Sequence, residues 1–188
     1  MEQIRKFLSS FVMLNDEDWN VFSSKLSRTT FPKKALILEK GKKEKHLSFI
    51  EKGIVRFNIP RPDYDFTFAF AFENTFFSAY DAFLTQKPCS YNIEAITDCV
   101  LWQISYEELA QVYEHTSAGD RIGRKIAEDL FLKKTKREMS LLEDTATKRY
   151  LDLLAEQPLL IRYIPQKYLA SYIGIRPQSL SRIRKAIK

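Results

Sequence analysis

The spacing of the apolar residues changes once along this 188-residue chain, at about Ser105, and this change limits the fold more than any other feature. Between residues 31 and 104, short runs of β-branched and aromatic residues are separated by Gly, Pro, Asp and Lys, which is typical of strands joined by turns. After Ser105 the apolar residues recur with the period of a helix. We therefore expect an α+β chain: a β-roll of the jelly-roll or double-stranded β-helix type, followed by helices.

Residues 1–30 are predicted to be helical, with Asn15 capping a helix whose first turn is acidic. The run 66–72 is the clearest strand, because strict alternation places four phenylalanines on one face and Thr67, Ala69 and Ala71 on the other. The phenylalanine face is expected to lie in the core, and the alternative is that the small-residue face lines a ligand cavity. The predicted strands are 35–39, 47–51, 54–59, 66–72, 91–96 and 99–104.

The helical part begins with a capping box, in which Ser105 precedes Glu108 by three residues. A long helix is expected at residues 117–143, and a further helix at 145–156 is ended by Pro158. The apolar stripe of the long helix contains Ile122, Ile126 and Leu130. This stripe either packs on the β unit or pairs with its copy in a second chain, and its spacing does not decide between them.

Residues 165–184 fit a helix-turn-helix position by position. Pro165 suits the start of the first helix, and Gly174 suits the turn, where a left-handed backbone is cheap for glycine. The second helix starts at Pro177. The inward positions are small or apolar, as two closely packed helices require: Leu169, Ala170, Ile173, Ile175, Leu180 and Ile183.

The outward face of the second helix carries hydrogen-bonding side chains of the kind that read base edges in the major groove. Arg182 is the best candidate for a bidentate contact with guanine. The predicted base contacts are Gln178, Ser179, Ser181 and Arg182. The predicted phosphate contacts, which position the helix without specifying a sequence, are Lys167, Arg176, Arg184, Lys185 and Lys188.

The excess of basic residues also lies at the C-terminal end of the chain, where the helix-turn-helix is predicted. Residues 1–120 hold 14 Lys and Arg against 17 Asp and Glu, whereas residues 157–188 hold seven basic residues and no acidic one. Such an asymmetry indicates a polyanion partner at the C-terminal end. Double-stranded DNA fits both this charge and the predicted helix-turn-helix.

Several classes of protein are excluded. No uncharged apolar run approaches 18 residues, so we expect no membrane span. Two cysteines, Cys89 and Cys99, are too few for a disulfide framework or an iron–sulfur cluster, and they fit a reduced, cytoplasmic setting. The spacings of a metal site, a catalytic triad and a phosphate loop are not found, so we expect neither a metal nor an enzyme.

The order of these elements resembles the Crp/Fnr family of bacterial transcription regulators, and the closing segment 169–185 is very similar to members common in Bacteroidetes-type bacteria. The resemblance implies a cyclic-nucleotide-binding-like sensor domain at 1–116, a long dimerisation helix at 117–143 and a winged helix-turn-helix domain at 144–188, with a short wing strand at 159–164. It also implies a homodimer on a near-palindromic DNA site and allows a contact with RNA polymerase.

The sequence departs from the family in the effector segment. In members that bind cyclic nucleotides, a glutamate in this segment takes the ribose hydroxyl and an arginine takes the phosphate. The corresponding residues are Ser78, Ala79 and Tyr80, followed by Cys89 and Ser90. Without the arginine, cyclic AMP is not expected to bind tightly. An unknown, less anionic small molecule, a thiol signal at Cys89, and no effector at all remain open.

A second departure is Arg176, which stands where many relatives have Thr or Ser as the cap of the second helix. The competing hypothesis for the whole chain is a small-molecule-binding module whose C-terminal helices contact a protein partner instead of DNA.

Overall fold

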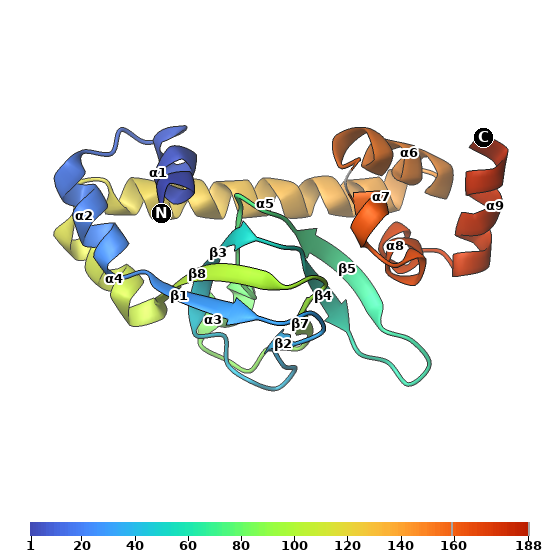
Figure 1. The fold of residues 1–188 in the computed structure, drawn as a ribbon, viewed down its shortest axis with the longest axis horizontal. Coiled ribbons are helices and arrows are strands. Elements are labelled where there is room, and N and C mark those ends of the chain that lie inside the picture. The colour runs from blue at the N-terminus through green and yellow to red at the C-terminus, as the bar shows by residue number, and fades with distance from the viewer. Residues whose placement is uncertain (159, 188) are drawn as a thin grey trace.

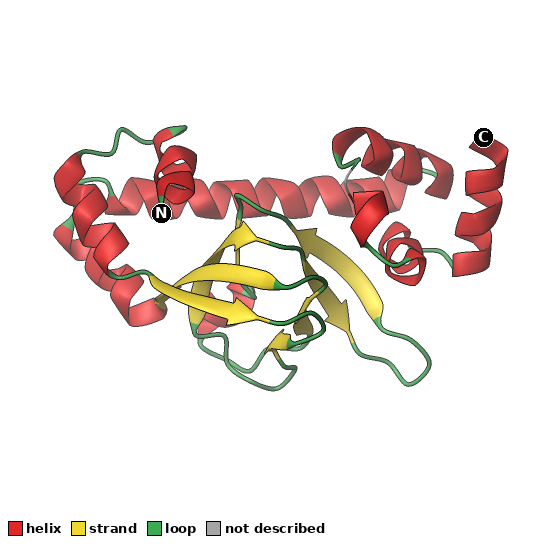
Figure 2. Cartoon of the chain, in the orientation of Figure 1, coloured by secondary structure: helices red, strands yellow, loops and turns green. Residues whose placement is uncertain are grey.

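The structure is a computed structural model that describes residues 1–158 and 160–187. A β-roll lies between a group of helices formed by both ends of the sensor region and a compact helical unit at the C-terminus (Figure 1). One long helix runs past the roll and joins the two groups. Helices flank the strands at both ends of the roll (Figure 2).

The N-terminal helices are α1 (Glu2–Ser9) and α2 (Asp16–Ser24). The predicted cap is confirmed, because the Asn15 Oδ1 accepts the Asp18 N–H at 2.7 Å. The helical prediction for residues 1–30 is wrong at its end, where β1 (Ser27–Phe31) begins. These residues alternate on a half-buried surface and pair with the last strand of the roll, and this tertiary pairing decides their conformation.

The β-roll consists of two four-stranded sheets, and all its strand pairs are antiparallel. The first sheet has the order β1–β8–β3–β6, with β8 at Cys99–Ser105, β3 at His46–Lys52 and β6 at Phe76–Phe77. The second has the order β2–β7–β4–β5, with β2 at Leu36–Leu38, β7 at Asn92–Ala95, β4 at Val55–Ile59 and β5 at Phe66–Ala71. A short helix, α3 (Tyr80–Thr85), follows β6.

The phenylalanines of β5 do not share one face, which corrects the prediction for residues 66–72. The pairing with β4 shifts by one residue between Phe57 and Asn58, so Phe68 is an extra residue in the strand. Phe68 therefore packs with the interior of the roll, beside Ala69 and Ala71. Phe70 packs against the C-terminal helical unit on the opposite face. The alternative, in which the small-residue face of this strand lines a cavity, is supported in part, because Ala69 and Ala71 line the interior of the roll.

The helices after the roll begin as predicted. Ser105 and Glu108 form the capping box of α4 (Tyr106–His115). The long helix is α5 (Gly119–Glu143), and α6 (Ala146–Glu156) is capped by Thr145. None of the helices in residues 1–158 and 160–187 is long and apolar enough to cross a membrane.

The helical unit continues with α7 (Leu160–Tyr163), α8 (Gln166–Ile173) and α9 (Pro177–Ile187). The wing strand expected at 159–164 is wrong: residues 160–163 are helical, and Leu159 lies outside the described residues. A wing strand needs a second strand to pair with, and every strand in the described part of the chain lies between residues 27 and 105.

Candidate functional site

The two C-terminal helices are joined by a tight turn. The left-handed Gly174, at a φ of 85°, ends α8, and the Ile175 N–H donates to the Ala170 carbonyl at 2.9 Å. The predicted inward residues Leu169, Ala170 and Leu180 are buried between the helices. The local backbone and packing therefore agree with the motif derived from residues 165–184.

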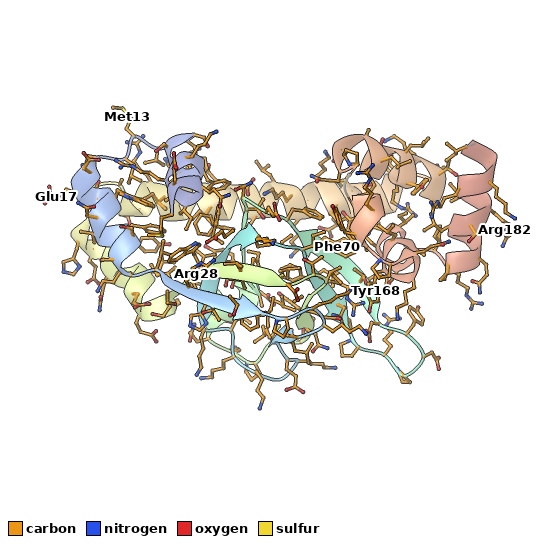
Figure 3. The ribbon with its side chains drawn as sticks, viewed as in Figure 1. Met13, Glu17, Arg28, Phe70, Tyr168 and Arg182 are labelled. Atoms are coloured by element: carbon orange, nitrogen blue, oxygen red, sulfur yellow. The ribbon has the colours of Figure 1, made fainter. Side chains whose placement is uncertain are left out.

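The outward face of α9 is formed by Gln178, Arg182 and Lys185, which are all exposed. They stand at i, i+4 and i+7, on the side of the helix opposite the buried Leu180. Arg182 lies on the outer side of the helix (Figure 3). This face can offer a guanidinium fork, an amide and an ammonium group to one partner surface.

The remaining predicted base contacts are less available. Ser179 is half-buried. The Ser181 hydroxyl accepts from the Gln166 Nε2 at 2.7 Å and donates to the Pro177 carbonyl at 3.1 Å, so it already holds the two helices together. Of the four predicted base contacts, Gln178 and Arg182 have free side chains on the outward face.

The predicted phosphate contacts surround this face. Lys167, Arg176 and Lys185 are exposed, and Arg184 is half-buried. Lys188 lies outside the described residues. Among the described residues, no basic side chain of 160–187 forms a salt bridge, and this segment itself contains no carboxylate side chain.

The opposite side of the helix pair is docked on the β-roll through α8. Arg56, in β4, is only 1% exposed. Its Nε donates to Glu94 at 3.1 Å and its Nη2 to Asp65 at 3.0 Å. The same guanidinium lies over the ring of Tyr168 in α8, with its carbon 3.7 Å from the ring centroid. The sequence analysis missed this residue, although an arginine inside an apolar strand is a signal of a paired charge.

A second contact joins α8 to the edge strand β5. The Thr67 N–H donates to the Ser171 Oγ at 2.8 Å, and this hydroxyl donates to the Asp65 carbonyl at 3.3 Å. Tyr172 packs on Phe70, with ring centroids 5.2 Å apart. We call these contacts, together with Arg56 and Tyr168, the docking contact. It fixes α8 on the roll and leaves the outward face of α9 free.

The predicted effector segment is largely closed by its own chain. Ser78 and Ala79 are buried: the Ser78 hydroxyl donates to the His46 carbonyl at 2.9 Å, and the Ala79 N–H donates to Glu44 at 3.3 Å. Glu44 is 7% exposed, and burial raises the pKa of its carboxyl group. The sequence analysis did not identify Glu44, a buried acidic group that accepts a hydrogen bond from the backbone of this segment.

The interior of the roll is aromatic. The rings of Phe57, Phe68 and Tyr91 lie within 6.3 Å of one another, and the Tyr91 hydroxyl donates to Asp81 at 2.5 Å. Cys89 is buried, and burial raises the pKa of its thiol, which favours a small core residue over a reactive thiolate. Tyr80 is half-buried and Ser90 is exposed. The residues described contain no cluster of His, Cys, Asp and Glu that could hold a metal ion.

The predicted stripe of α5 faces the same chain. Ile122 and Ile126 are buried against the N-terminal helices and the roll, and Leu130 is partly buried there. This is the first of the two alternatives for the stripe. The apolar side chains that α5 leaves exposed are Phe131, Leu132, Met139, Leu141 and Leu142, with exposed fractions of 66%, 64%, 44%, 38% and 76%.

Comparison with known proteins agrees with this architecture. Residues 28–116 match the family model "Cyclic nucleotide-binding domain". No curated protein sequence matches the chain. The solved structures similar to it include the global regulator CLP of Xanthomonas campestris, described as c-di-GMP responsive, with 19% identity and a TM-score of 0.72 over 92% of this chain and 91% of that one.

Two further solved structures have the same fold. A putative transcriptional regulator of the Crp/Fnr family from Eubacterium rectale is 16% identical, with a TM-score of 0.71 over 92% of this chain and 83% of that one. FixK2 from Bradyrhizobium japonicum is 17% identical, with a TM-score of 0.70 over 86% and 84% of the two chains.

Proposed function

We propose that the chain is a sequence-specific DNA-binding transcription regulator that acts as a homodimer, because residues 28–116 match the cyclic nucleotide-binding domain model and the chain has the fold of the solved Crp/Fnr-type regulators. In this proposal residues 1–116 are the sensor, 117–143 the dimerisation helix and 144–188 a helix-turn-helix domain without a wing strand. No catalytic role is assigned to it.

The observation that carries the proposal is the face of α9. Gln178, Arg182 and Lys185 point away from the chain on a helix that a second helix anchors, in a segment with no acidic side chain. A helix in the major groove must present long hydrogen-bonding side chains while its neighbour rests on the backbone. Arg182 is the proposed guanine contact and Gln178 the proposed second base contact. The exposed Lys167 and Arg176 lie where phosphate contacts are needed.

The homodimer is proposed on a stripe of α5 different from the one that contains Ile126. Leu132, Thr135, Met139 and Leu142 follow the 3–4–3 spacing of a coiled-coil seam, and they lie on the side of the helix opposite Ile126 and Arg137. Three of them, Leu132, Met139 and Leu142, are among the exposed apolar residues of this helix. We expect Leu142→Glu to convert the dimer to a monomer in sedimentation experiments, whereas Lys134→Glu, an exposed change off the seam, should leave it dimeric.

Cyclic AMP is not the proposed effector. An anionic phosphate in the effector segment would meet the acidic groups of Glu44, which accepts the Ala79 N–H, and Asp81, which accepts the Tyr91 hydroxyl. Arg56 is already occupied by Glu94, Asp65 and Tyr168. An effector that favours one geometry of the dimer would change the distance between the two copies of α9.

Selection of binding sites from random duplex DNA tests the proposal, repeated with and without a cell metabolite extract. We expect enrichment of a near-palindromic sequence whose half-site centres are about 34 Å apart. Binding should weaken steeply as salt rises, because phosphate contacts release counterions. No enrichment, together with no competition by nonspecific DNA, would contradict the proposal and favour a protein partner for the C-terminal helices.

A further inference from the structure

A groove with a volume of about 1190 Å³ separates α5 from the edge strand β5 and continues between α5 and the helical unit. Its walls come from α3, β5, α5, α6 and α8. The part along α5 extends from Ala127 to Asp144, which is about 25 Å of helix. This groove includes Ser78 and Tyr80 of the effector segment but extends well beyond them, to the joint between the long helix and α8.

One cation in this groove lacks an acceptor. Arg137 stacks on the ring of Tyr172, with its guanidinium carbon 3.8 Å from the ring centroid. Its Nε and Nη2 atoms are buried and have no hydrogen-bond partner among the described residues. Burial lowers the pKa of Arg137, and the neighbouring Arg149 lowers it further while Tyr172 opposes both.

The basic side chains next to Arg137 have hydrogen-bond or salt-bridge partners. Lys133 pairs with Asp129 at 2.7 Å, and Lys136 pairs with Glu156 at 2.7 Å. Arg149 donates to the backbone carbonyls of α5 and α8. Arg137 is therefore the groove cation whose buried donors are unsatisfied within the described chain. Leaving donors of a charged group without an acceptor is costly, so an acceptor at this place would be strongly favoured.

The surroundings of Arg137 restrict what the acceptor can be. Phe70 packs beside Tyr172, and along α5 the groove reaches Leu130 and the exposed Phe131, two helical turns or about 10 Å from Arg137. The far end of the groove has the acidic Asp81, which would repel a second negative charge. The groove thus offers one cation with buried, unsatisfied donors, Arg137, next to a long apolar surface. Its exposed lining also carries charges of both signs, among them Lys134, Glu143 and Lys148.

We propose that this groove binds an organic carboxylate with an apolar body, whose carboxylate accepts hydrogen bonds from Arg137 and whose body lies along α5 toward Leu130 and Phe131. A carboxylate is chosen because its two oxygens match the fork of a guanidinium. The binding does not depend on the proposed DNA-binding function, and it can be measured without DNA.

Titration calorimetry of the full-length chain with decanoate and with 1-decanol tests the proposal. The two probes share an apolar body and differ in the charged head. We expect the wild type to bind decanoate at least about tenfold more tightly than decanol, the effect of a charge-assisted hydrogen bond. Arg137→Gln should lose this preference and still bind decanol. Arg124→Gln, the same change at an exposed arginine outside the groove, should retain it.

Three outcomes would overturn the proposal. Equal affinity of the wild type for decanoate and decanol would mean that no cation of the groove binds the carboxylate. This comparison holds even if Arg137→Gln fails to fold. Absence of decanoate binding by the wild type would remove the site altogether. If Arg137→Gln converts the dimer to a monomer but leaves the affinity for decanoate unchanged, the hydrogen-bond acceptor of Arg137 belongs to a second copy of the chain.

Discussion

The adjacent helices α8 and α9 differ in what holds them. Four of the eight residues of α8 are buried, and the docking contact ties its Tyr168 and Ser171 to the β-roll. In α9 only Leu180 is buried among eleven residues, and its outward face contacts no other part of the described chain. The position of α9 is therefore set by how α8 sits on the roll, while its chemistry is left for a partner. Changes on the α8 side should alter stability and geometry, and changes on the outward face of α9 should alter binding alone.

The largest effect is expected from Arg56→Met. Removing the guanidinium leaves the mostly buried Glu94 without its partner and takes away the cation that stacks on Tyr168. Breaking a buried ion pair costs about 3–5 kcal/mol, and the partial exposure of Asp65 places this case near the lower end. The free energy of unfolding, measured by urea denaturation, should fall by about that amount, and amide hydrogen exchange in α8 should accelerate.

The double variant Arg56→Met/Glu94→Gln is the control. It removes the stranded carboxylate and should recover part of the lost stability, while the contact with Tyr168 stays absent. If Arg56→Met costs less than about 1 kcal/mol, the network is not a structural element of the docking contact.

On the α9 side, Arg182→Ala should leave the unfolding free energy nearly unchanged, since Arg182 is exposed and unpaired among the described residues. On the selected DNA site it should lose about 1–3 kcal/mol of binding free energy, and on random DNA much less. Titration of both DNAs at one salt concentration gives the comparison. An equal loss on both would make Arg182 a phosphate contact, and a loss of stability would mean that α9 is held like α8.

The sequence predicted α9 better than α8 because the two helices depend on different information. The face of α9 follows from spacing within eleven residues, with Leu180 and Arg182 on opposite sides. The docking of α8 depends on Arg56, more than 100 positions away, and on the register shift that turns Phe70 toward the helices. The arginine in an apolar strand signals a paired charge but not which distant residues it contacts, and a one-residue bulge has no local signal.

The same limit explains the effector segment and the wing. The sequence identifies Ser78 and Cys89 as residues that replace the cyclic-nucleotide-binding residues of the family. Both are buried, which agrees with an effector segment that is closed by its own chain. Glu44, which takes the Ala79 N–H, comes from a loop before β3 and could not be predicted from the segment itself. At residues 159–164 a mostly apolar run of six, interrupted by Arg162, is too short to separate strand from helix by its period.

A smaller effect is expected from Ser171→Ala, which tests the second half of the docking contact. The Thr67 N–H, in the edge strand β5, would lose its acceptor, and this should cost about 1 kcal/mol of unfolding free energy. Ser171→Thr, which keeps the hydroxyl, is the matched control and should retain more of the stability. An unchanged midpoint of denaturation for Ser171→Ala would mean that water replaces the hydroxyl, and that docking depends on Arg56 and the aromatic contacts.

The smallest effect is expected at the junction of the two helices. The backbone carbonyl of Arg176 accepts from the Ser179 and Leu180 N–H groups, so Arg176 is the cap of α9, but its side chain cannot accept a helix N–H as threonine can. Arg176→Thr should therefore raise the unfolding free energy by about 0.5 kcal/mol or more. If Arg176 contacts a phosphate, the slope of log affinity against log salt should become less steep by about 0.9, with equal weakening on cognate and random DNA. A loss confined to one base position would instead place Arg176 among the base contacts. A single substitution that stabilises the fold while weakening DNA binding would show that this position belongs to the binding surface of α9 and not to the docked surface of α8.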